Sequence, residues 1–454
     1  MSAKPQLFGT DGVRGVAGRY PLDQETVVKL GRALAAVLTA QTGVARPEIL
    51  LGCDTRESSP WIVSALAAGL QAGGARVTFA GVITTPGVAF LTRHRGFAAG
   101  AMISASHNSY EDNGVKFLSS AGTKLSEPLE LEIERALARM SGPATVGSRP
   151  DLKPSPDLVE DYLQFLESLV PSGNHISGFQ LVVDCANGAA GAIAPKFFKK
   201  TGIKARIIHA DPTGRNINRD CGSLYPASMT SATERTSADL GVAFDGDADR
   251  AIFASRAGRV LDGDHVLFAA APFFKDRSLL KGGAVAGTLM TNLGLETALK
   301  SRGIGLKRTA VGDKFVLEEI LRSSLNLGGE PSGHIIFSDL SLAGDGFITL
   351  VQMLSLLAAT GATLDELMRD YRPFPQIILN VRVREREPLD AVPGVARALE
   401  NCRGDLGERG RVVLRYSGTE PLARVMVEGE DAALVLRHAE QIAAAVESAL
   451  GSAG

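Results

Sequence analysis

Residues 98–103, Ala-Ala-Gly-Ala-Met-Ile, run directly into Ser104-Ala105-Ser106-His107-Asn108, and the interpretation of the whole chain starts from this junction. The apolar run predicts a buried strand. The residues after it place two hydroxyls, an imidazole and an amide at the carboxyl end of that strand, where open α/β sheets bind their ligands. A polar turn that only ends the strand is the alternative, because Ser and Asn are ordinary turn residues. A nucleophilic serine here would give the other polar clusters of the chain a common centre.

Strand and helix patterns alternate along the residues before this junction. Residues 49–51 and 76–79 predict short strands. Ser59-Pro60 and Thr84-Thr85-Pro86 predict helix starts, because Ser and Thr cap helices and proline fits the first helical turn. This alternation is typical of an α/β layer.

The same alternation starts again at Leu181 and at Ala284. Three units of roughly 100 residues therefore follow one plan. After residues 371–375 the pattern changes to three strands with two helices, which indicates a smaller α+β domain. We predict an α/β protein of three similar α/β domains and a smaller α+β C-terminal domain, with a linker at residues 141–156. The expected domains are residues 1–150, 151–256, 257–371 and 372–454.

Composition excludes several classes of protein. The 454 residues carry a formal net charge of −2, which argues against a nucleic-acid-binding surface. The four cysteines are far apart and form no CxxC pair, so we expect reduced thiols and a cytoplasmic location. No apolar leader segment is found at the N-terminus. The long uncharged run at residues 346–364 is interrupted by polar residues and Gly, so we expect a buried helix there and no membrane partner.

Three carboxylates alternate in Asp245-Gly-Asp247-Ala-Asp249. Alternation along an extended segment directs them to one side, and three hard oxygen ligands suit Mg²⁺. An EF-hand is excluded, because its sixth and twelfth positions would hold Arg250 and Arg256 instead of Gly and Glu. A solvated acidic turn is the alternative, but carboxylates this close repel one another unless a cation joins them.

Three further loops carry groups that bind anions or hydroxyls. The Gly-rich residues 8–15 include Arg14, whose guanidinium can bind a phosphate through two hydrogen bonds. Residues 415–419, Arg-Tyr-Ser-Gly-Thr, combine a guanidinium, two hydroxyls and a flexible backbone suited to an anion, although an ordinary hairpin turn is an equal alternative. Residues 328–334 offer a carboxylate, a hydroxyl and an imidazole, a mixture that suits sugar hydroxyls.

These clusters together describe phosphoryl transfer through a phosphoserine. The chain has no GxxxxGK[ST] and no GxGxxG motif, and Ser106 is not in a GxSxG elbow, so a P-loop enzyme, a dinucleotide enzyme and an esterase are disfavoured. Lys116 or His107 would exchange protons with the sugar hydroxyl. A phosphatase needs only one anion loop, so the second loop at Arg415 favours a mutase.

Five motifs, in this order along the chain, resemble those of the α-D-phosphohexomutase family, and the resemblance covers nearly the whole chain. They are Phe-Gly-Thr-Asp-Gly-Val-Arg-Gly at 8–15, Ile-Ser-Ala-Ser-His-Asn at 103–108, Asp-Gly-Asp-Ala-Asp-Arg at 245–250, Gly-Gly-Glu-Pro-Ser-Gly-His at 328–334 and Arg-Tyr-Ser-Gly-Thr-Glu-Pro at 415–421.

The resemblance implies four domains around a central cleft and a mutase reaction. A phosphorylated Ser106 would give its phosphoryl group to one end of the sugar, the 1,6-bisphosphate would turn in the cleft, and the other phosphate would return to the serine. The implied metal ligands, for one Mg²⁺ in each active site, are Ser106, Asp245, Asp247 and Asp249. The implied catalytic residues are Ser106, His107, Lys116, Arg14 and Arg250. The implied substrate-binding residues are Gly312, Asp313, Glu330, Ser332, His334, Arg415, Ser417, Gly418, Thr419 and Arg424.

Within the family, residues 213–223, 292–296 and 417–429 are similar to a bacterial branch that interconverts glucosamine 6-phosphate and glucosamine 1-phosphate, a step that feeds UDP-N-acetylglucosamine and cell-wall synthesis. The phosphomannomutase/phosphoglucomutase branch, which more often has Asn at position 418, is the alternative. A metal-dependent sugar-phosphate phosphatase and a sugar-phosphate-binding protein are more distant alternatives. The expected partners are a small-molecule sugar phosphate, glucosamine 1,6-bisphosphate as intermediate and activator, and, as an open option, a second copy of the chain.

Three positions depart from the family pattern. Ser109 stands where Pro is common, Pro331 where this branch usually has Gln, and Cys53 where a basic residue is common before Asp-Thr-Arg. Pro331 leaves the fine sugar preference open. None of the three removes an implied catalytic group.

Overall fold

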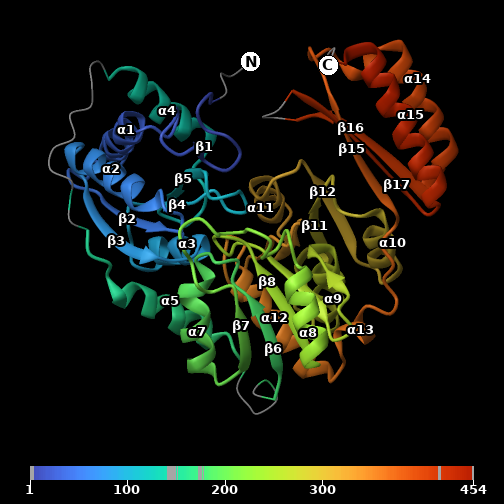
Figure 1. Cartoon of the computed structure of the whole chain (residues 1–454), viewed down its shortest axis with the longest axis horizontal. Coiled ribbons are helices and arrows are strands. Elements are labelled where there is room, and N and C mark those ends of the chain that lie inside the picture. Colours follow the sequence, from blue (N-terminus) through green and yellow to red (C-terminus); the bar gives the residue numbers. More distant parts are fainter. Residues whose placement is uncertain are drawn as a thin grey trace.

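Four separate sheets follow one another along the chain (Figure 1). The structure is a computed structural model, and it describes residues 5–140, 150, 152–171, 176, 178–417 and 421–451. Most of the predicted linker, residues 141–149 and 151, lies outside the described residues, so the domain limits at both of its ends stay predictions.

The first sheet holds the Ser106 strand at its centre. Its order is β1 (Val13–Val16), β5 (Asp112–Ser119), β4 (Ala99–Ile103), β2 (Glu48–Cys53) and β3 (Arg76–Val82). Strand β2 pairs in parallel with β3 and β4, whereas β5 runs antiparallel to β4 and β1 antiparallel to β5. The helices of this part are α1 (Gln24–Thr42), α2 (Ser59–Ala72), α3 (Thr85–His94) and α4 (Glu127–Ala138). The start predicted at Thr84 is confirmed, because the Thr84 side chain accepts a hydrogen bond from the Gly87 amide.

The second sheet repeats the order of the first. It runs β10 (Val260–Leu261), β9 (Ala251–Ser255), β8 (Leu240–Phe244), β6 (Gln180–Asp184) and β7 (Lys204–Ile208). As β2 does in the first sheet, β6 pairs in parallel with both neighbours, and β9 runs antiparallel to β8. The antiparallel edge strand differs, because β1 comes from the start of the first unit and β10 from the end of the second. Its helices are α5 (Pro156–Ser168), α7 (Ala190–Thr201) and α8 (Ala227–Thr236).

The third sheet follows the same plan with one strand fewer. Its order is β12 (Gly305–Thr309), β11 (Ala284–Thr288), β13 (Leu327–Gly329) and β14 (Ile335–Phe337). The accompanying helices are α9 (Gly263–Asp276), η1 (Lys281–Gly283), α10 (Leu293–Ser301), α11 (Asp313–Arg322), α12 (Gly346–Thr360) and α13 (Leu364–Leu367). The predicted common plan of three α/β units is confirmed.

The last part of the chain is a smaller α+β unit with a core of its own. Its antiparallel sheet has the order β15 (Gln376–Arg382), β17 (Leu422–Gly429) and β16 (Gly410–Tyr416). Helices α14 (Pro393–Leu406) and α15 (Ala432–Leu450) pack on this sheet, with the short turns η2 (Leu389–Ala391) and η3 (Gly407–Arg409). In Figure 1 this red unit lies at one end of the molecule, beside the third unit. The predicted α+β C-terminal domain is therefore confirmed.

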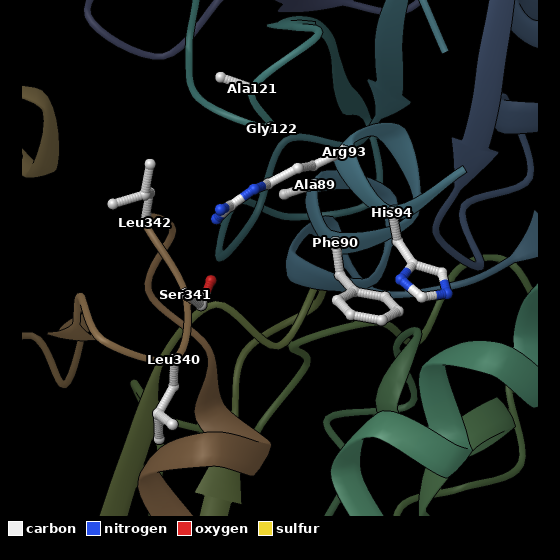
Figure 2. A pocket seen from close by; sticks show the side chains of 9 residues that line it. All are labelled: Ala89, Phe90, Arg93, His94, Ala121, Gly122, Leu340, Ser341 and Leu342. Carbon is white, nitrogen blue, oxygen red and sulfur yellow. The ribbon is translucent and has the colours of Figure 1, made fainter. Parts of the chain in front are cut away.

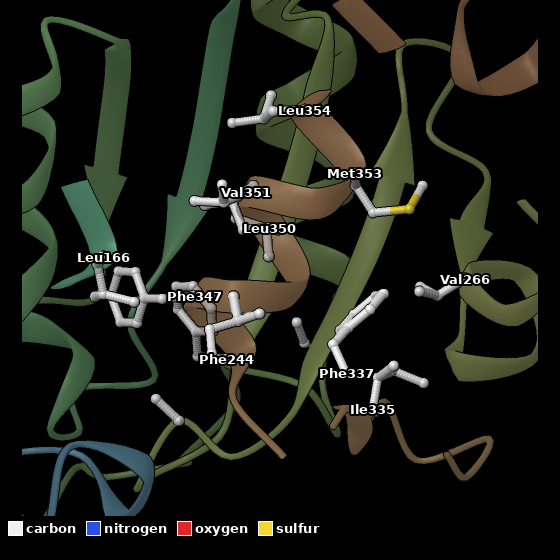
Figure 3. Close-up of a cluster of buried hydrophobic side chains, with 14 of the residues drawn as sticks. Leu166, Phe244, Val266, Ile335, Phe337, Phe347, Leu350, Val351, Met353 and Leu354 are labelled. Carbon is white, nitrogen blue, oxygen red and sulfur yellow. The ribbon is translucent and has the colours of Figure 1, made fainter. Parts of the chain in front are cut away.

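Helix α12 lies in the large core that the first three units share (Figure 3). Phe347 stacks on Phe244 of β8 with ring centroids 4.6 Å apart, and Phe337 of β14 belongs to the same cluster. This helix is the uncharged run that we predicted to be buried, and ten of its residues are buried. Among the described residues, no helix is both long and apolar enough to cross a membrane.

The first turn of this helix is capped by a buried carboxylate. Asp345 accepts hydrogen bonds from the amides of Phe347 (2.8 Å) and Ile348 (3.1 Å) and from the Tyr162 hydroxyl of α5 (2.7 Å). Burial raises the pKa of Asp345 from 3.8 to about 6, against the lowering effect of these three donors. The folded protein therefore binds more protons here than the unfolded chain between these two values, and this group's contribution to stability falls as pH rises through that window.

We expect Tyr162→Phe to lower the free energy of unfolding by about 1–3 kcal/mol, because it removes one donor from a buried carboxylate. The aromatic contact of this ring with Phe90 stays in place. Without the hydroxyl the pKa of Asp345 rises further, so the loss should be larger at about pH 8 than at about pH 5. Thermal unfolding at both pH values measures this loss of unfolding free energy. Tyr225→Phe is the control, because Tyr225 is half exposed. Equal losses at the two pH values would contradict this role of the hydroxyl.

Candidate active site

Ser106 stands at the carboxyl end of β4 and faces the second unit. It is 1% exposed, and its backbone has a φ of 54°, a left-handed conformation that is uncommon for residues other than glycine. Its Oγ donates a hydrogen bond to Asp245 Oδ2 at 2.6 Å. The Ser106 Oγ also lies 3.3 Å from His107 Nδ1. The carboxyl ends of β4 and β8 therefore bring the predicted serine and the first predicted aspartate into contact.

Two residues outside the predicted set hold the serine loop in this position. The Arg56 guanidinium donates to the carbonyls of Ser106 (3.0 Å) and Asn108 (2.9 Å), and the Asn218 amide donates to the same two carbonyls, each at 2.9 Å. Arg56 is 1% exposed and pairs with Asp54 at 2.9 Å. Arg56 belongs to the Asp-Thr-Arg sequence after Cys53 and Asn218 to the motif at 213–223, but neither was predicted as a site residue.

Three of the four predicted metal ligands, the aspartates, form a buried cluster. One carboxylate oxygen from each of Asp245, Asp247 and Asp249 lies within 4.8 Å of the others. The Oδ1 atoms of Asp247 and Asp249 are buried without a hydrogen-bond partner. Burial, followed by the charges of Asp249 and Asp247, raises the pKa of Asp245 well above its usual range. A bound cation would remove this repulsion and use the free oxygens, so the cluster fits a hard metal ion.

Lys116 is fully buried beside these carboxylates. Its Nζ lies 2.7 Å from Asp247 Oδ2, 3.0 Å from Asp11 Oδ2 and 3.8 Å from Asp249 Oδ2. Burial favours the neutral amine, but the three carboxylates outweigh it and hold the pKa of Lys116 well above its usual range. Lys116 is therefore a cation at neutral pH and is a poor proton acceptor. Asp11 also forms an ion pair with Lys124. It lies in the motif at 8–15 but was not predicted as a site residue.

His107 has the opposite electrostatics. Burial, and then the charges of Arg250 and Arg14, lower the pKa of His107 to about 4. Its imidazole is therefore neutral at physiological pH and can accept a proton next to the Ser106 hydroxyl. Of the two groups predicted to exchange protons, His107 is the one whose charge state allows it.

The two predicted catalytic arginines lie on either side of the serine loop. Arg14 pairs with Asp11 and donates to the Ala105 carbonyl at 3.3 Å. Arg250 Nε lies 3.8 Å from Asp249 Oδ1 and is buried without a hydrogen-bond partner. A buried guanidinium nitrogen without a partner is suited to an anionic ligand.

The predicted sugar loop lies next to the acidic cluster. His334 Nδ1 is 3.6 Å from Asp249 Oδ2 and its Nε2 is 3.8 Å from Asp313 Oδ2. Burial favours the neutral ring, but Asp249, Asp313 and Glu330 outweigh it and raise the pKa of His334 to about 9. The Oγ of Ser332 and the Nε2 of His334 are buried without hydrogen-bond partners. Both atoms can therefore form hydrogen bonds with the hydroxyls of a ligand.

The start of helix α11 lies beside the predicted sugar loop. Glu330 Oε1 accepts a hydrogen bond from the Gly312 amide at 3.1 Å, and Gly312 precedes the helix with a φ of 132°. The Lys124 ammonium of the first unit binds Asp313 Oδ1 at 2.7 Å. The predicted residues of the third unit are thus tied directly to the first unit.

The loop at residues 415–419, which was predicted to bind an anion, belongs to the fourth unit and lies apart from Ser106. Arg415 and Arg424 are direct partners across β16 and β17, so two positively charged side chains lie next to each other on this sheet. Together with Ser417 and Gly312 they line a cavity of about 530 Å³. Gly418 and Thr419 lie outside the described residues, so their predicted part in this loop stays a prediction.

A second cavity connects this loop to the acidic cluster. It measures about 240 Å³, and Lys116, Asp249 and His334 line it. Lys124, Leu125 and Lys314 belong to the lining of both cavities. The two cavities therefore adjoin and extend from Lys116, Asp249 and His334 to the paired arginines, between the first, third and fourth units, while Ser106 lies behind them in contact with Asp245.

A third cavity, of about 270 Å³, lies between α3 and residues 340–342 (Figure 2). Arg93 reaches across it from α3 toward this loop, as Figure 2 shows. None of the predicted site residues lines it. It shares Ala89, Gly122 and Leu342 with the 240 Å³ cavity, so it lies on the outer side of the same cleft.

The three residues that depart from the family pattern, Cys53, Ser109 and Pro331, each have a structural contact. Cys53 is buried in the core of the first unit, where its thiol contacts the Gly81 carbonyl at 3.7 Å. The Ser109 carbonyl accepts a hydrogen bond from Arg56. The Pro331 carbonyl accepts one from the Gly263 amide at 3.2 Å.

Models of four protein families match consecutive parts of the chain. All four are described as phosphoglucomutase/phosphomannomutase: alpha/beta/alpha domain I at residues 5–142, domain II at 160–258, domain III at 262–374, and the C-terminal domain at 378–445.

Curated relatives match over nearly the full length. A phosphoglucosamine mutase of Koribacter versatilis is 49% identical and covers 98% of this chain and 97% of its own. The phosphoglucosamine mutase of Deinococcus radiodurans is 43% identical, with 99% of both chains covered. That of Thermus thermophilus is 45% identical over 94% of this chain and 95% of its own.

Solved structures share the fold. A phosphoglucomutase/phosphomannomutase family protein from Burkholderia thailandensis has a TM-score of 0.78 at 22% identity and covers 97% of both chains. The N-acetylphosphoglucosamine mutase of Aspergillus fumigatus, solved with GlcNAc-6P and magnesium, has a TM-score of 0.65 at 18% identity and covers 94% of this chain and 97% of its own.

We expect Mg²⁺ to raise the melting temperature of the protein, and Asp245→Asn to abolish most of that rise by weakening the binding at least about tenfold. Without Mg²⁺ the variant should be no less stable than the wild type, because it removes one of three carboxylates that repel one another. Thermal unfolding with and without Mg²⁺ measures both effects, with Asp370→Asn as the control because Asp370 is exposed. An undiminished Mg²⁺ effect in Asp245→Asn would place the metal elsewhere.

Proposed function

The chain belongs to the phosphoglucomutase/phosphomannomutase family, the α-D-phosphohexomutases, and we propose that it acts as a phosphoglucosamine mutase, interconverting glucosamine 6-phosphate and glucosamine 1-phosphate. One observation carries the proposal: Ser106 contacts the buried Asp245–Asp247–Asp249 cluster, and adjoining cavities extend from Asp249 of this cluster to the Arg415–Arg424 pair. Relatives named phosphoglucosamine mutase, 43–49% identical over nearly the full chain, support the substrate.

The reaction moves a phosphoryl group from Ser106 to one end of the sugar phosphate and takes the other phosphate back. Asp245, Asp247 and Asp249, with an oxygen of phosphorylated Ser106, would hold one Mg²⁺, which neutralises charge on the phosphoryl oxygens. Lys116 and Arg250 contribute fixed positive charge on the same side of the cleft.

His107 moves the proton. Its neutral imidazole accepts a proton from the attacking sugar hydroxyl and passes it to the Ser106 oxygen that leaves, and the reverse transfer takes the proton back along the same route. It lies 3.3 Å from the Ser106 oxygen, which is within reach of the reacting centre.

The rest of the cleft holds the sugar and its second phosphate. Glu330, Ser332 and His334 bind the hydroxyls, and Gly312 and Asp313 shape the same wall. The loop that begins at Arg415 binds the phosphate that is not reacting. Glucosamine 1,6-bisphosphate turns between the two ends, so each phosphate meets this loop once in every cycle.

The second anion site separates this proposal from a phosphatase. A phosphatase releases its product after one transfer and needs only the Ser106 end of the cleft, whereas a mutase must keep the bisphosphate. The phosphomannomutase/phosphoglucomutase alternative uses the same chemistry on another sugar. Parallel assays with glucosamine 6-phosphate, mannose 6-phosphate and glucose 6-phosphate separate the two, and glucosamine 6-phosphate should give the highest kcat/KM.

A cytoplasmic location belongs to the same proposal. All four cysteines are buried and unpaired, which suits a reducing compartment. A homodimer stays a prediction, which the mass of the protein in solution tests.

We expect Ser106→Ala to abolish turnover and to remove the phosphorylated fraction that intact-protein mass spectrometry finds in the wild type. Ser109→Ala, which changes a neighbouring hydroxyl, is the control and should keep both. Turnover near the wild-type rate in Ser106→Ala would refute the phosphoserine mechanism. Loss of turnover with unchanged phosphorylation would move the nucleophile to Ser104, whose Oγ accepts a hydrogen bond from the Ser106 amide.

For Arg415→Ala we expect kcat/KM to fall by an equivalent of about 2–4 kcal/mol, because a charge-assisted contact to the distal phosphate is lost. Ser106 should still become phosphorylated, and more free glucosamine 1,6-bisphosphate should be released in each turnover. Arg382→Ala, an exposed arginine on β15 of the same sheet, is the matched control. Normal kcat/KM with no extra bisphosphate would show that the loop is only a hairpin turn.

A further inference from the structure

A second group of metal-binding side chains lies in the second unit, apart from the acidic cluster. Asp184 at the end of β6, His209 just after β7 and Cys221 offer one ligand atom each, and these atoms lie within 4.8 Å of one another. The carboxyl ends of two adjacent parallel strands bring the first two together, since Asp184 pairs with Ile208 in the sheet. The mechanism above uses none of the three.

The carboxylate of this group is already fixed in position. Asp184 is fully buried, its Oδ1 accepts a hydrogen bond from the Ala186 amide at 2.8 Å, and its Oδ2 accepts one from the Gly222 amide at 3.0 Å. Each oxygen keeps a further lone pair. Backbone donors that orient a carboxylate in this way are typical of the groups that support metal ligands.

The other two ligand atoms lack strong partners. His209 Nδ1 lies 3.0 Å from Asp184 Oδ2, yet it is buried without a hydrogen bond of acceptable geometry. Cys221 is 1% exposed, and its Sγ has only a weak contact with the Asn187 amide at 3.7 Å. Burial, and then the charge of Asp184, raise the pKa of the Cys221 thiol to about 12, so a metal would have to displace its proton.

The donor set decides which ion fits. A carboxylate oxygen, an imidazole nitrogen and a thiolate sulfur suit Zn²⁺, whereas Mg²⁺ and Ca²⁺ take oxygen ligands. Three protein ligands leave the fourth tetrahedral position to water. About a third of the His209 side chain is exposed, at 32%, which gives the ion a path from solvent.

We propose that Asp184, His209 and Cys221 form a Zn²⁺ site that is independent of the Mg²⁺ cluster. The ion would join the ends of β6 and β7 to the loop between residues 209 and 221. That loop carries Asn218, whose amide holds the Ser106 and Asn108 carbonyls, so the site would stabilise the support of the serine loop. The site takes no part in the mutase reaction.

The test compares Zn²⁺ binding by the full-length wild type and variants in excess Mg²⁺, which keeps the acidic cluster occupied. Zn²⁺ affinity is measured by competition with a chromophoric chelator. Co²⁺ is then used as a probe, because a Co²⁺–thiolate bond gives a near-ultraviolet charge-transfer band that oxygen ligands do not give. The variants are His209→Asn and Cys221→Ser, and their controls are His94→Asn, an exposed histidine, and Cys402→Ser in the fourth unit.

We expect the wild type to bind one Zn²⁺ and to show the Co²⁺–thiolate band. His209→Asn and Cys221→Ser should each weaken Zn²⁺ binding at least about 100-fold, because each removes a ligand outright, and Cys221→Ser should lose the band. The two controls and Asp245→Asn should bind Zn²⁺ as the wild type does. His209→Asn changes a partly exposed side chain, so its melting curve without Zn²⁺ should match the wild type and show that the variant is folded.

Absence of Zn²⁺ binding in the wild type, or equal binding by His209→Asn, would overturn the proposal. Loss of Zn²⁺ binding in Asp245→Asn alone would show that the ion occupies the acidic cluster. None of these outcomes bears on mutase turnover, so failure of this proposal and failure of the proposed function can be told apart.

Discussion

The structure depends on a balance of buried charge at the contact between the first and second units. Asp245, Asp247 and Asp249 are buried together, and within the protein Lys116, Arg250 and His334 oppose their charge. Groups of this kind are costly to bury and are stable only when paired, so each partner fixes the position of the next. The Ser106 hydroxyl is directed into this network by its bond to Asp245. A phosphoryl group placed there would find positive charge already in position, which is how a site lowers a barrier without reorganising.

The three α/β units explain why this contact can form. Each sheet presents the carboxyl ends of its parallel strands to the others, so loops from positions 106, 245 and 330 meet although they are far apart in sequence. Lys124 and Asp313 link the first unit to the third, and Arg56 and Asn218 link the serine loop to the first and second units. The fourth unit contributes the paired arginines from a separate core, which makes it the part that can recognise a phosphate at the far end of the cleft.

The sequence predicted the repeated α/β plan, the α+β unit and the residues of the motifs, because periodicity and short polar clusters are local signals. It did not predict the residues that support the site by binding groups from distant parts of the chain. Arg56, Asp11 and Asn218 matter because of carbonyls and charges that only the folded chain brings near them. Ser59 shows the same limit: the sequence predicts a helix cap there, but its hydroxyl donates to Asp54 at 2.9 Å instead, and Ser58 holds the cap position without a side-chain bond. Charge states were also out of reach, since the opposite shifts of His107 and Lys116 come from burial and neighbours.

In the proposed mechanism, one phosphoryl group passes from Ser106 into the product and is replaced by the phosphate that the substrate brought. A single-turnover experiment tests this transfer: enzyme that carries radiolabelled phosphate on Ser106 is mixed with unlabelled glucosamine 6-phosphate. The label should leave the protein and be recovered in glucosamine 1-phosphate, while unlabelled phosphate takes its place on the serine. Label that stays on the protein during turnover, or that is released as inorganic phosphate, would contradict it.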